Sequence, residues 1–339
     1  MRTPVYAAPL TAVGLISASA LAYEILLTRI FAVIHWHHLV ATAISLALLG
    51  YGASGTFLTI VGKRLRDHFA PVFIANALLF SLSSLGCVWM AQRLPFDPQA
   101  LTWDPHQLVY LAATFLILAI PFFAAANCIG LALWTFREQI PRLYGYDLIG
   151  AGLGAALLLA GLALVSPADN LFGIFTAGLV VAITASVTLP WRPIAVTVAS
   201  LLILTLAWTV GRPVLQPAVY KDLARSLAVT GATLEHAESG VAGTLSVVRN
   251  DQVPIRTAPG MSLQSMAMPP RQLAVFIDGD AVGTVYANDT GEKSRDYLKD
   301  LTSALPYRLL VQPRVAVLNA GTGLGVEQAI RLGAASVNA

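Results

Sequence analysis

The feature that most constrains this chain is a series of seven long apolar segments in its first 210 residues. A helix needs about 20 apolar residues to cross the roughly 30 Å hydrocarbon core of a bilayer. Backbone polar groups in lipid must be satisfied within the segment, so these segments are expected to be helices. The segments are residues 9–33, 39–61, 72–92, 108–134, 145–165, 170–189 and 194–210, of which the last is the shortest. The sequence therefore predicts a multi-pass α-helical membrane bundle over residues 1–212, with the lipid bilayer as its partner.

Composition supports this division of the chain. Only 12% of the residues are charged and 56% are hydrophobic, whereas about a quarter of a soluble domain is charged. Residues 211–339 resemble an ordinary soluble sequence. No basic stripe with interleaved aromatic residues is found, so we expect no nucleic-acid partner. Cys87 and Cys128 lie in apolar runs and are expected to be small buried side chains, not a disulfide or a metal pair.

The distribution of basic residues predicts an orientation in the inner cell membrane. Basic side chains gather after the second, fourth and sixth segments, and they are Lys63, Arg64, Arg66, Arg137, Arg142 and Arg192. The positive-inside rule places these loops and the N-terminus in the cytoplasm. Seven crossings would then place the soluble part outside, which conflicts with the use of a cytosolic cofactor. Either one segment does not cross, or the rule fails here, or the domain is external.

Two charged residues lie inside the first apolar segment. Glu24 and Arg29 each cost about 2.5–3.5 kcal/mol on insertion scales, so they should face the bundle interior and pair with each other or with neighbours. They form either a polar site or ion path, or a structural pair that holds the first helix in place. The nearby His35, His37 and His38 favour an interfacial loop, because no matching ligands at a recognisable spacing support a metal or haem site.

Two groups of glycines predict close helix packing, because small residues let helix backbones approach each other. The groups are Gly150 and Gly154, which follow Asp147 in the fifth segment, and Gly50, Gly52 and Gly55 in the second. No segment shows the paired, broken helices of a secondary transporter.

The soluble part is expected to begin with a linker and a small β-hairpin region over residues 213–290. Residues 243–250, GTLSVVRN, have the composition of a strand. Residues 273–286 contain two β-rich runs around the sequence Asp278-Gly279-Asp280, which indicates a hairpin.

Residues 291–339 predict the start of an incomplete Rossmann-like α/β domain of the methyltransferase type. The first element of this domain is a predicted helix, because four apolar residues recur at helical spacing: Tyr297, Leu301, Leu305 and Leu309. A short apolar strand (314–320), the turn GTGLG (321–325), a helical stretch and a second strand from residue 336 follow. This order is that of a βαβ unit.

The glycine turn is the predicted ligand site of this domain. Gly321, Gly323 and Gly325 would let the backbone approach a ligand closely, and the helix N-terminus attracts its polar or anionic groups. A tight strand-to-helix turn without a ligand is the alternative. The acidic residue that grips a ribose hydroxyl should follow the glycines by about 20 positions. That position falls just beyond Ala339, so we expect a C-terminally truncated, inactive chain.

These residues resemble a known family. FIDGD, RDYLKDL and VLNAGTGLG are similar to the hairpin, helix and glycine loop of spermidine synthase-like proteins, or polyamine aminopropyltransferases. SALAYEILLTRIF and LYGYDLIGAGLGAAL resemble the membrane region fused to a subset of that family. The resemblance covers most of the chain, and the order of the motifs is more specific than any one of them.

The resemblance implies a membrane-anchored transferase of the aminopropyl or methyl type. S-adenosylmethionine or its decarboxylated form would be the co-substrate, not covalently bound, and a small molecule such as a polyamine would be the acceptor. Gly321, Gly323 and Gly325 would approach the co-substrate with Asp278. The alternative role for Asp278 is only to shape the hairpin. Two departures argue against true spermidine synthase activity: Leu298 and Lys299 replace polar family positions after Tyr297, and no glutamine follows the Asp-Gly turn. Catalytic residues are not assigned.

Two other functions remain open from the sequence. Glu24, Arg29 and the altered region after Tyr297 favour a non-catalytic transporter or sensor with a degenerate α/β domain. A dinucleotide-binding oxidoreductase is the third possibility. Neither the oligomeric state nor the substrate follows from the residues.

Overall fold

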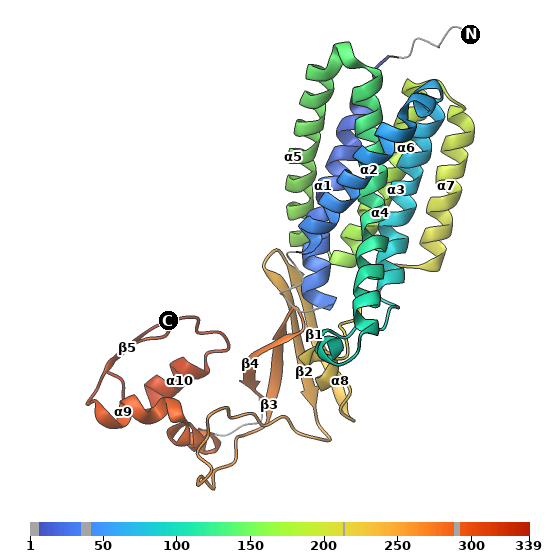
Figure 1. The fold of residues 1–339 in the computed structure, drawn as a ribbon. Helices are drawn as coiled ribbons and strands as arrows, with labels where there is room; N and C mark the ends of the chain where they lie inside the picture. The colour runs from blue at the N-terminus through green and yellow to red at the C-terminus, as the bar shows by residue number, and fades with distance from the viewer. Residues whose placement is uncertain (1–6, 35–41, 213, 288–291) are drawn as a thin grey trace. The chain divides into compact units, whose positions relative to one another are not determined.

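The structure is a computed structural model that describes residues 7–34, 42–212, 214–287 and 292–339. It divides into two compact units (Figure 1). The first unit, called the membrane unit below, comprises Met1–Gln216 and Ser239–Val241. The second, called the α/β unit, comprises Pro217–Glu238 and Ala242–Ala339.

The membrane unit contains the predicted helices. In the described residues seven helices are long and apolar enough to cross a membrane. They are α1 (Leu10–Ile34), α2 (Thr42–Asp67), α3 (Phe69–Ala91), α4 (His106–Thr135), α5 (Ile140–Leu164), α6 (Pro167–Thr188) and α7 (Pro193–Val210). Every predicted apolar segment is therefore confirmed as a helix, with its ends shifted by a few residues. The largest shift is at α2, which ends at residue 67 instead of 61.

Local chemistry determines where several of these helices begin. A proline stands in the first turn of α5, α6 and α7, at Pro141, Pro167 and Pro193. Proline is favoured there because its missing N–H is one that the helix cannot use and its φ is already helical. Ser166 also caps α6, because its hydroxyl accepts a hydrogen bond from the Asp169 N–H at 3.2 Å.

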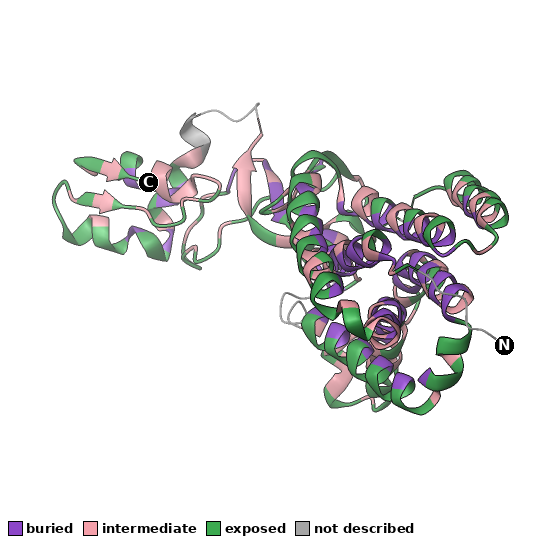
Figure 2. Ribbon diagram, turned by 90° about the horizontal axis from the view of Figure 1, so that it is seen from above, coloured by how far each residue is buried: buried purple, intermediate pink, exposed green. Residues whose placement is uncertain are grey.

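Burial within the bundle identifies α1 as the central helix and α7 as a peripheral one. In the most apolar stretch of α1, 61% of the residues are buried, against 11% in α7. Figure 2 shows the buried residues on the helix faces that are turned toward one another. The outward faces are apolar, and Leu164, Ile194 and Val210 are each at least 80% exposed. Such a surface is stable in lipid and unfavourable in water.

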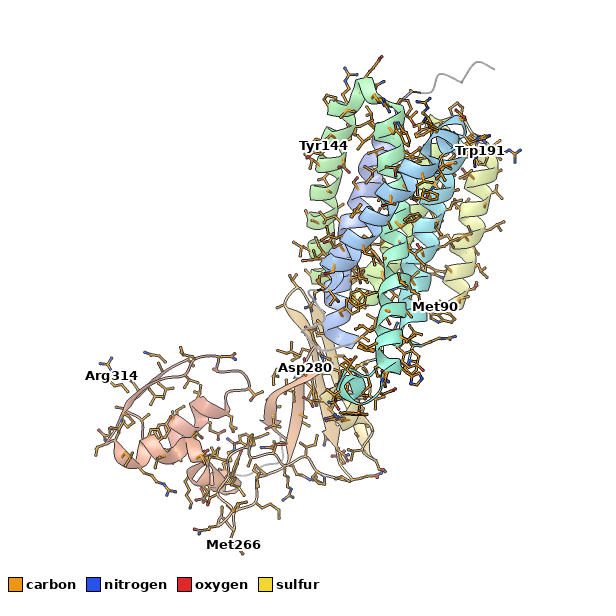
Figure 3. The ribbon with its side chains drawn as sticks, viewed as in Figure 1. Met90, Tyr144, Trp191, Met266, Asp280 and Arg314 are labelled. Atoms are coloured by element: carbon orange, nitrogen blue, oxygen red, sulfur yellow. The ribbon has the colours of Figure 1, made fainter. Side chains whose placement is uncertain are left out.

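Aromatic side chains lie near both ends of the bundle. Figure 3 shows Tyr144 and Trp191 toward the end where α5 and α7 begin, and Met90 toward the opposite end, where α3 finishes. Trp89, beside Met90, stacks under the Arg93 guanidinium, which lies 3.5 Å from the ring centroid. Tyrosine and tryptophan are enriched at the two interfaces of a membrane protein, so these residues mark the edges of the apolar band.

The α/β unit begins with the short helix α8 (Asp222–Leu227) and an antiparallel sheet in the order β1-β2-β3-β4. The strands are β1 (Ala232–Gly240), β2 (Gly243–Asn250), β3 (Gln272–Ile277) and β4 (Asp280–Tyr286). The predicted strand at residues 243–250 and the predicted hairpin are confirmed. Strand β1 was not predicted, because its sequence ATLEHAESG is polar and none of its residues is buried.

A smaller αβ segment follows the sheet. It comprises two 3₁₀ helices, η4 (Glu292–Asp300) and η5 (Thr302–Ala304), then α9 (Leu305–Leu309), β5 (Arg314–Ala316), α10 (Leu324–Arg331) and β6 (Ser336–Asn338). Strands β5 and β6 pair in parallel, with Val315 opposite Val337, and α10 lies between them in the chain. The predicted order strand, glycine turn, helix and strand is therefore present.

The helix predicted from Tyr297 to Leu309 is interrupted. The Ser262 N–H donates to the Asp300 carbonyl, and the Thr302 N–H donates to the Gly260 carbonyl, each at 2.8 Å. These bonds draw the backbone around Leu301 away from helical pairing, and Pro306 supplies no N–H. The result is two 3₁₀ segments and a short α-helix instead of one continuous helix.

Candidate functional site

The glycine turn between β5 and α10 takes a conformation that only glycine adopts without strain. Gly321 has φ 55° and Gly323, the N-cap of α10, has φ 84°. Both values lie in the left-handed region, where a Cβ would crowd the backbone. Gly325 has a different role, because a Cβ there would lie 3.4 Å from the Val317 side chain. It allows the first turn of α10 to pack closely on the residue that follows β5.

Strand β4 contacts this turn through Gly283, which was not among the predicted site residues. A Cβ on Gly283 would lie 2.8 Å from the Thr322 hydroxyl, and Gly283 has φ 153°. A glycine inside a strand often marks a close approach of backbone, and this rule could have identified Gly283. The hairpin and the glycine turn therefore meet at Gly283 and Thr322.

A buried group of polar side chains lies at the open end of the same hairpin. The Tyr297 hydroxyl lies 3.1 Å from the Tyr286 hydroxyl and accepts a hydrogen bond from Gln272 Nε2 at 3.4 Å. Tyr297 is 1% exposed. Burial raises the pKa of both tyrosines above the ordinary value, so both hydroxyls stay neutral at physiological pH. Tyr297 thus belongs to a hydrogen-bonded core.

Charged side chains line one part of an open cavity beside the glycine turn. Glu327 on α10 forms ion pairs with Arg295 at 2.9 Å and Arg331 at 3.0 Å. The Arg295 guanidinium also lies 4.5 Å from the Tyr286 ring centroid. Together with Gly323, these charged residues line a cavity of about 550 Å³, which is in the usual range for a small-molecule site.

Asp278 lies at the closed end of the hairpin, and its described contacts are there. Its carboxylate accepts a hydrogen bond from the Thr244 N–H at 2.8 Å, and its backbone carbonyl accepts one from Lys221 Nζ at 2.9 Å. Its φ of 52° places it in the turn itself. These contacts fit a role in shaping the hairpin, and none of them brings Asp278 to the glycine turn.

Lys221 at this hairpin end was not predicted. Its side chain is fully buried and forms an ion pair with Asp280 at 2.9 Å. The sequence offered no signal for it, because it is a lysine in an irregular stretch whose partners are about 60 residues away. The ion pair fixes the start of α8 against the hairpin, as a structural contact.

In the membrane unit, Glu24 and Arg29 both lie on α1 and both are half-buried. They are five residues apart, which separates them by about 140° around the helix. That they pair with each other stays a prediction. The residues His35, His37 and His38 lie outside the described part of the chain.

The glycines of α5 form the predicted close-packing face. A Cβ on Gly150 would fall on the backbone of Gly14, and one on Gly154 would fall on the backbone of Ala18. Asp147, one turn before Gly150, accepts a hydrogen bond from Ser17 of α1. Helices α1 and α5 therefore pack with their backbones in contact, as GxxxG-type sequences allow.

The glycine face predicted on α2 is only partly present. Gly50 packs against the backbone of α4, where a Cβ would lie 2.8 Å from the Ala119 carbonyl oxygen. Gly52 and Gly55 have open space in the described structure, so the prediction was wrong for them. Gly50 lies on a different side of the helix from Gly52 and Gly55, because positions two or five residues apart do not share a face.

Metal and cysteine chemistry can be stated for the described residues. They contain no group of three or more histidine, cysteine or carboxylate side chains that could hold a metal ion. Cys87 and Cys128 are free and buried, as predicted, and belong to the core of the bundle.

The fold and these sites define a class of protein: a membrane protein with seven membrane-length apolar helices, followed by a unit that has an antiparallel sheet and a small βαβ segment. Comparison takes the assignment no further. No protein family matches the sequence, and neither a curated protein nor a solved structure matches it.

Proposed function

We propose that this protein is a membrane-anchored, spermidine synthase-like transferase of the inner cell membrane that uses an S-adenosyl co-substrate. The observation that carries the proposal is the glycine turn at Gly321 to Gly325, which leads from β5 into the N-terminus of α10. The first N–H groups of a helix have no partner within the helix, so they are available to a ligand. The family resemblance of the flanking motifs supports the same assignment.

The cavity beside the turn supplies further support. Gly323 lines it together with Arg295 and Glu327. A carboxylate can accept hydrogen bonds from ribose hydroxyls, and an arginine can bind the carboxylate of a methionine moiety. The site has groups of both kinds. S-adenosylmethionine can use both, whereas its decarboxylated form has no carboxylate and can use only the carboxylate of the site.

The residues of the site do not distinguish an aminopropyl from a methyl group as the group transferred. Transfer to an amine needs a neutral acceptor and a carboxylate to position it and take its proton. Leu298, where the family has a polar residue, is 1% exposed and packs in the core with Tyr297. The proposal therefore covers both aminopropyl and methyl transfer, and it assigns no catalytic base.

Ligand binding by a glycine variant tests the proposal. Gly323→Ala puts a Cβ at the turn in a left-handed conformation, whereas Gly333→Ala does the same after the end of α10, where nothing lies within 4 Å. Each should cost about 1–2 kcal/mol of backbone strain. Calorimetric titration of the full chain in lipid nanodiscs should show binding of S-adenosylmethionine, its decarboxylated form or methylthioadenosine, weakened only by Gly323→Ala. Absence of binding by all three compounds would refute the proposal.

A non-catalytic transporter or sensor is the second candidate. It is favoured by polar groups within the membrane unit, namely the half-buried Glu24 and Arg29 and the Ser17–Asp147 hydrogen bond. Turnover of an amine acceptor by the full chain would exclude it.

A further inference from the structure

A second cavity lies inside the membrane unit. It has a volume of about 400 Å³ and is lined by residues of α1, α2, α4 and α5. Its polar lining consists of Asp147 and Ser17, with Tyr51 and Ser54 of α2, and the remaining lining is aliphatic or glycine. Pockets of this size and composition bind small molecules with a largely apolar body.

Asp147 supplies the charge of this cavity. It stands seven residues into α5, about 10 Å from the start of the helix. Ser17 donates a hydrogen bond to one carboxylate oxygen. Within the described residues, no lysine, arginine or histidine lies within ion-pair distance of this carboxylate. A carboxylate at this depth costs free energy unless a cation faces it, so such residues mark binding sites or ion pathways.

The other polar groups of the lining are already engaged or neutral. The Ser54 hydroxyl donates to Asn127 Oδ1 at 2.7 Å, and Asn127 Nδ2 donates to Asn76 Oδ1 at 3.2 Å. This chain of hydrogen bonds joins α2, α4 and α3 and leaves lone pairs on the Ser54 oxygen. The described residues that line the cavity therefore present acceptors and one carboxylate, and none of them is cationic.

The lining selects one kind of cation. A metal ion would require several carboxylate or carbonyl oxygens, and the cavity offers a single carboxylate. The Tyr51 ring in the wall can attract an ammonium group, and the aliphatic residues suit a hydrocarbon body. Tyr51 and Gly55 are exposed on the outer surface of the bundle, so the cavity opens toward the surrounding lipid.

We propose that this cavity binds an amphiphilic monoamine from the bilayer, with the protonated amine on Asp147 and the hydrocarbon part against α2 and α4. One negative charge matches one positive charge, and the depth of Asp147 places the ammonium group near the interface while the chain stays in the apolar band. This proposal does not depend on the transferase assignment, because the two sites share no residue.

Binding of a fluorescent amphiphile tests the proposal. The probe is a dansyl-labelled long-chain primary amine, and the corresponding long-chain alcohol is the neutral comparison, both added to the full chain in nanodiscs of neutral lipid. Asp147→Asn keeps an acceptor for Ser17 but removes the charge. It should weaken amine binding about tenfold or more, the loss expected for one charged hydrogen bond, and leave alcohol binding unchanged.

A matched pair of glycine variants provides a test that does not change the charge. Gly55→Leu fills the cavity and should weaken binding of both probes. Gly52→Leu places the same side chain one turn earlier, outside the cavity lining, and should change neither; both glycines have open space around them. The proposal is overturned if the amine binds no better than the alcohol, or if Asp147→Asn or Gly55→Leu binds the amine as the parent protein does.

Discussion

At the scale of single residues, the polar groups buried in this protein divide into structural and chemical ones. Lys221 and the tyrosine pair are satisfied by their neighbours: Lys221 by Asp280, and Tyr297 by Tyr286 and Gln272. Satisfied buried groups of this kind specify packing. Asp147, in contrast, accepts one hydrogen bond and lines a cavity, so its carboxylate is available to bind a cationic ligand.

The tyrosine pair predicts a dependence on alkaline pH. Burial raises the pKa of Tyr297 in the folded protein above the unfolded value, which is near 10. Its stabilising contribution is therefore complete below about pH 10 and is lost as the pH rises through the folded-state pKa. Tyr297→Phe should cost about 1 kcal/mol at neutral pH, from the lost hydrogen bonds. It should also reduce the fall in stability above about pH 10.

Thermal unfolding at a series of pH values measures both effects. Tyr307→Phe is the matched control, because Tyr307 is half-buried and has no hydrogen bond from its hydroxyl in the described structure. An equal effect of the two substitutions would contradict the role given to Tyr297.

At the scale of elements, the packing of α1 on α5 depends on the absence of side chains at particular positions. Gly150 and Gly154 are one turn apart, so they lie on one face and meet Gly14 and Ala18 of α1. Ser17 and Asp147 add a hydrogen bond across the same face. Backbone atoms cannot rotate away, so a larger residue on this face must separate the two helices.

Leucine substitutions on α5 test this packing. Gly150→Leu should destabilise the bundle by about 1–3 kcal/mol or more, because its Cβ would overlap the backbone of Gly14. Gly152→Leu is on the same helix and meets nothing within 4 Å, so it should leave the melting temperature unchanged or slightly raised. Thermal unfolding in nanodiscs compares the two, and equal melting temperatures would show that α1 and α5 do not pack as described.

The elements that sequence predicts well are those with a strong local pattern. The seven apolar helices, the hairpin around Asp278 and the glycine turn were all predictable, because hydropathy, strand composition and glycine placement are local signals. Strand β1 was not, because its polar sequence lacks the alternating pattern of a half-buried strand. The interruption at Leu301 was not, because it is set by hydrogen bonds to a distant segment. The membrane cavity also escaped prediction, since it requires side chains from four helices.

At the scale of the whole molecule, the number of crossings determines where the chain goes after α7. Seven crossings place the basic loops after α2, α4 and α6 on one side of the membrane and the chain after α7 on the other. Helix α7 is the one whose crossing is least secured by packing, because only 11% of its apolar stretch is buried. Its 18 residues span about 27 Å, slightly less than the hydrocarbon core. Its mean hydropathy of 2.0 is nevertheless as high as that of α6, so we expect it to cross.

Labelling of single cysteines tests whether α7 crosses the membrane. The parent for the experiment is Cys87→Ala with Cys128→Ala, and the reporters are Arg64→Cys at the end of α2, Gln99→Cys between α3 and α4, and Arg225→Cys in α8, all exposed. A membrane-impermeant maleimide added to spheroplasts should label Gln99→Cys and Arg225→Cys but not Arg64→Cys, since the basic loops belong in the cytoplasm. If Arg225→Cys is protected while Gln99→Cys is labelled, α7 does not cross. The α/β unit would then have direct access to cytosolic S-adenosyl compounds, and the conflict between orientation and cofactor would be removed.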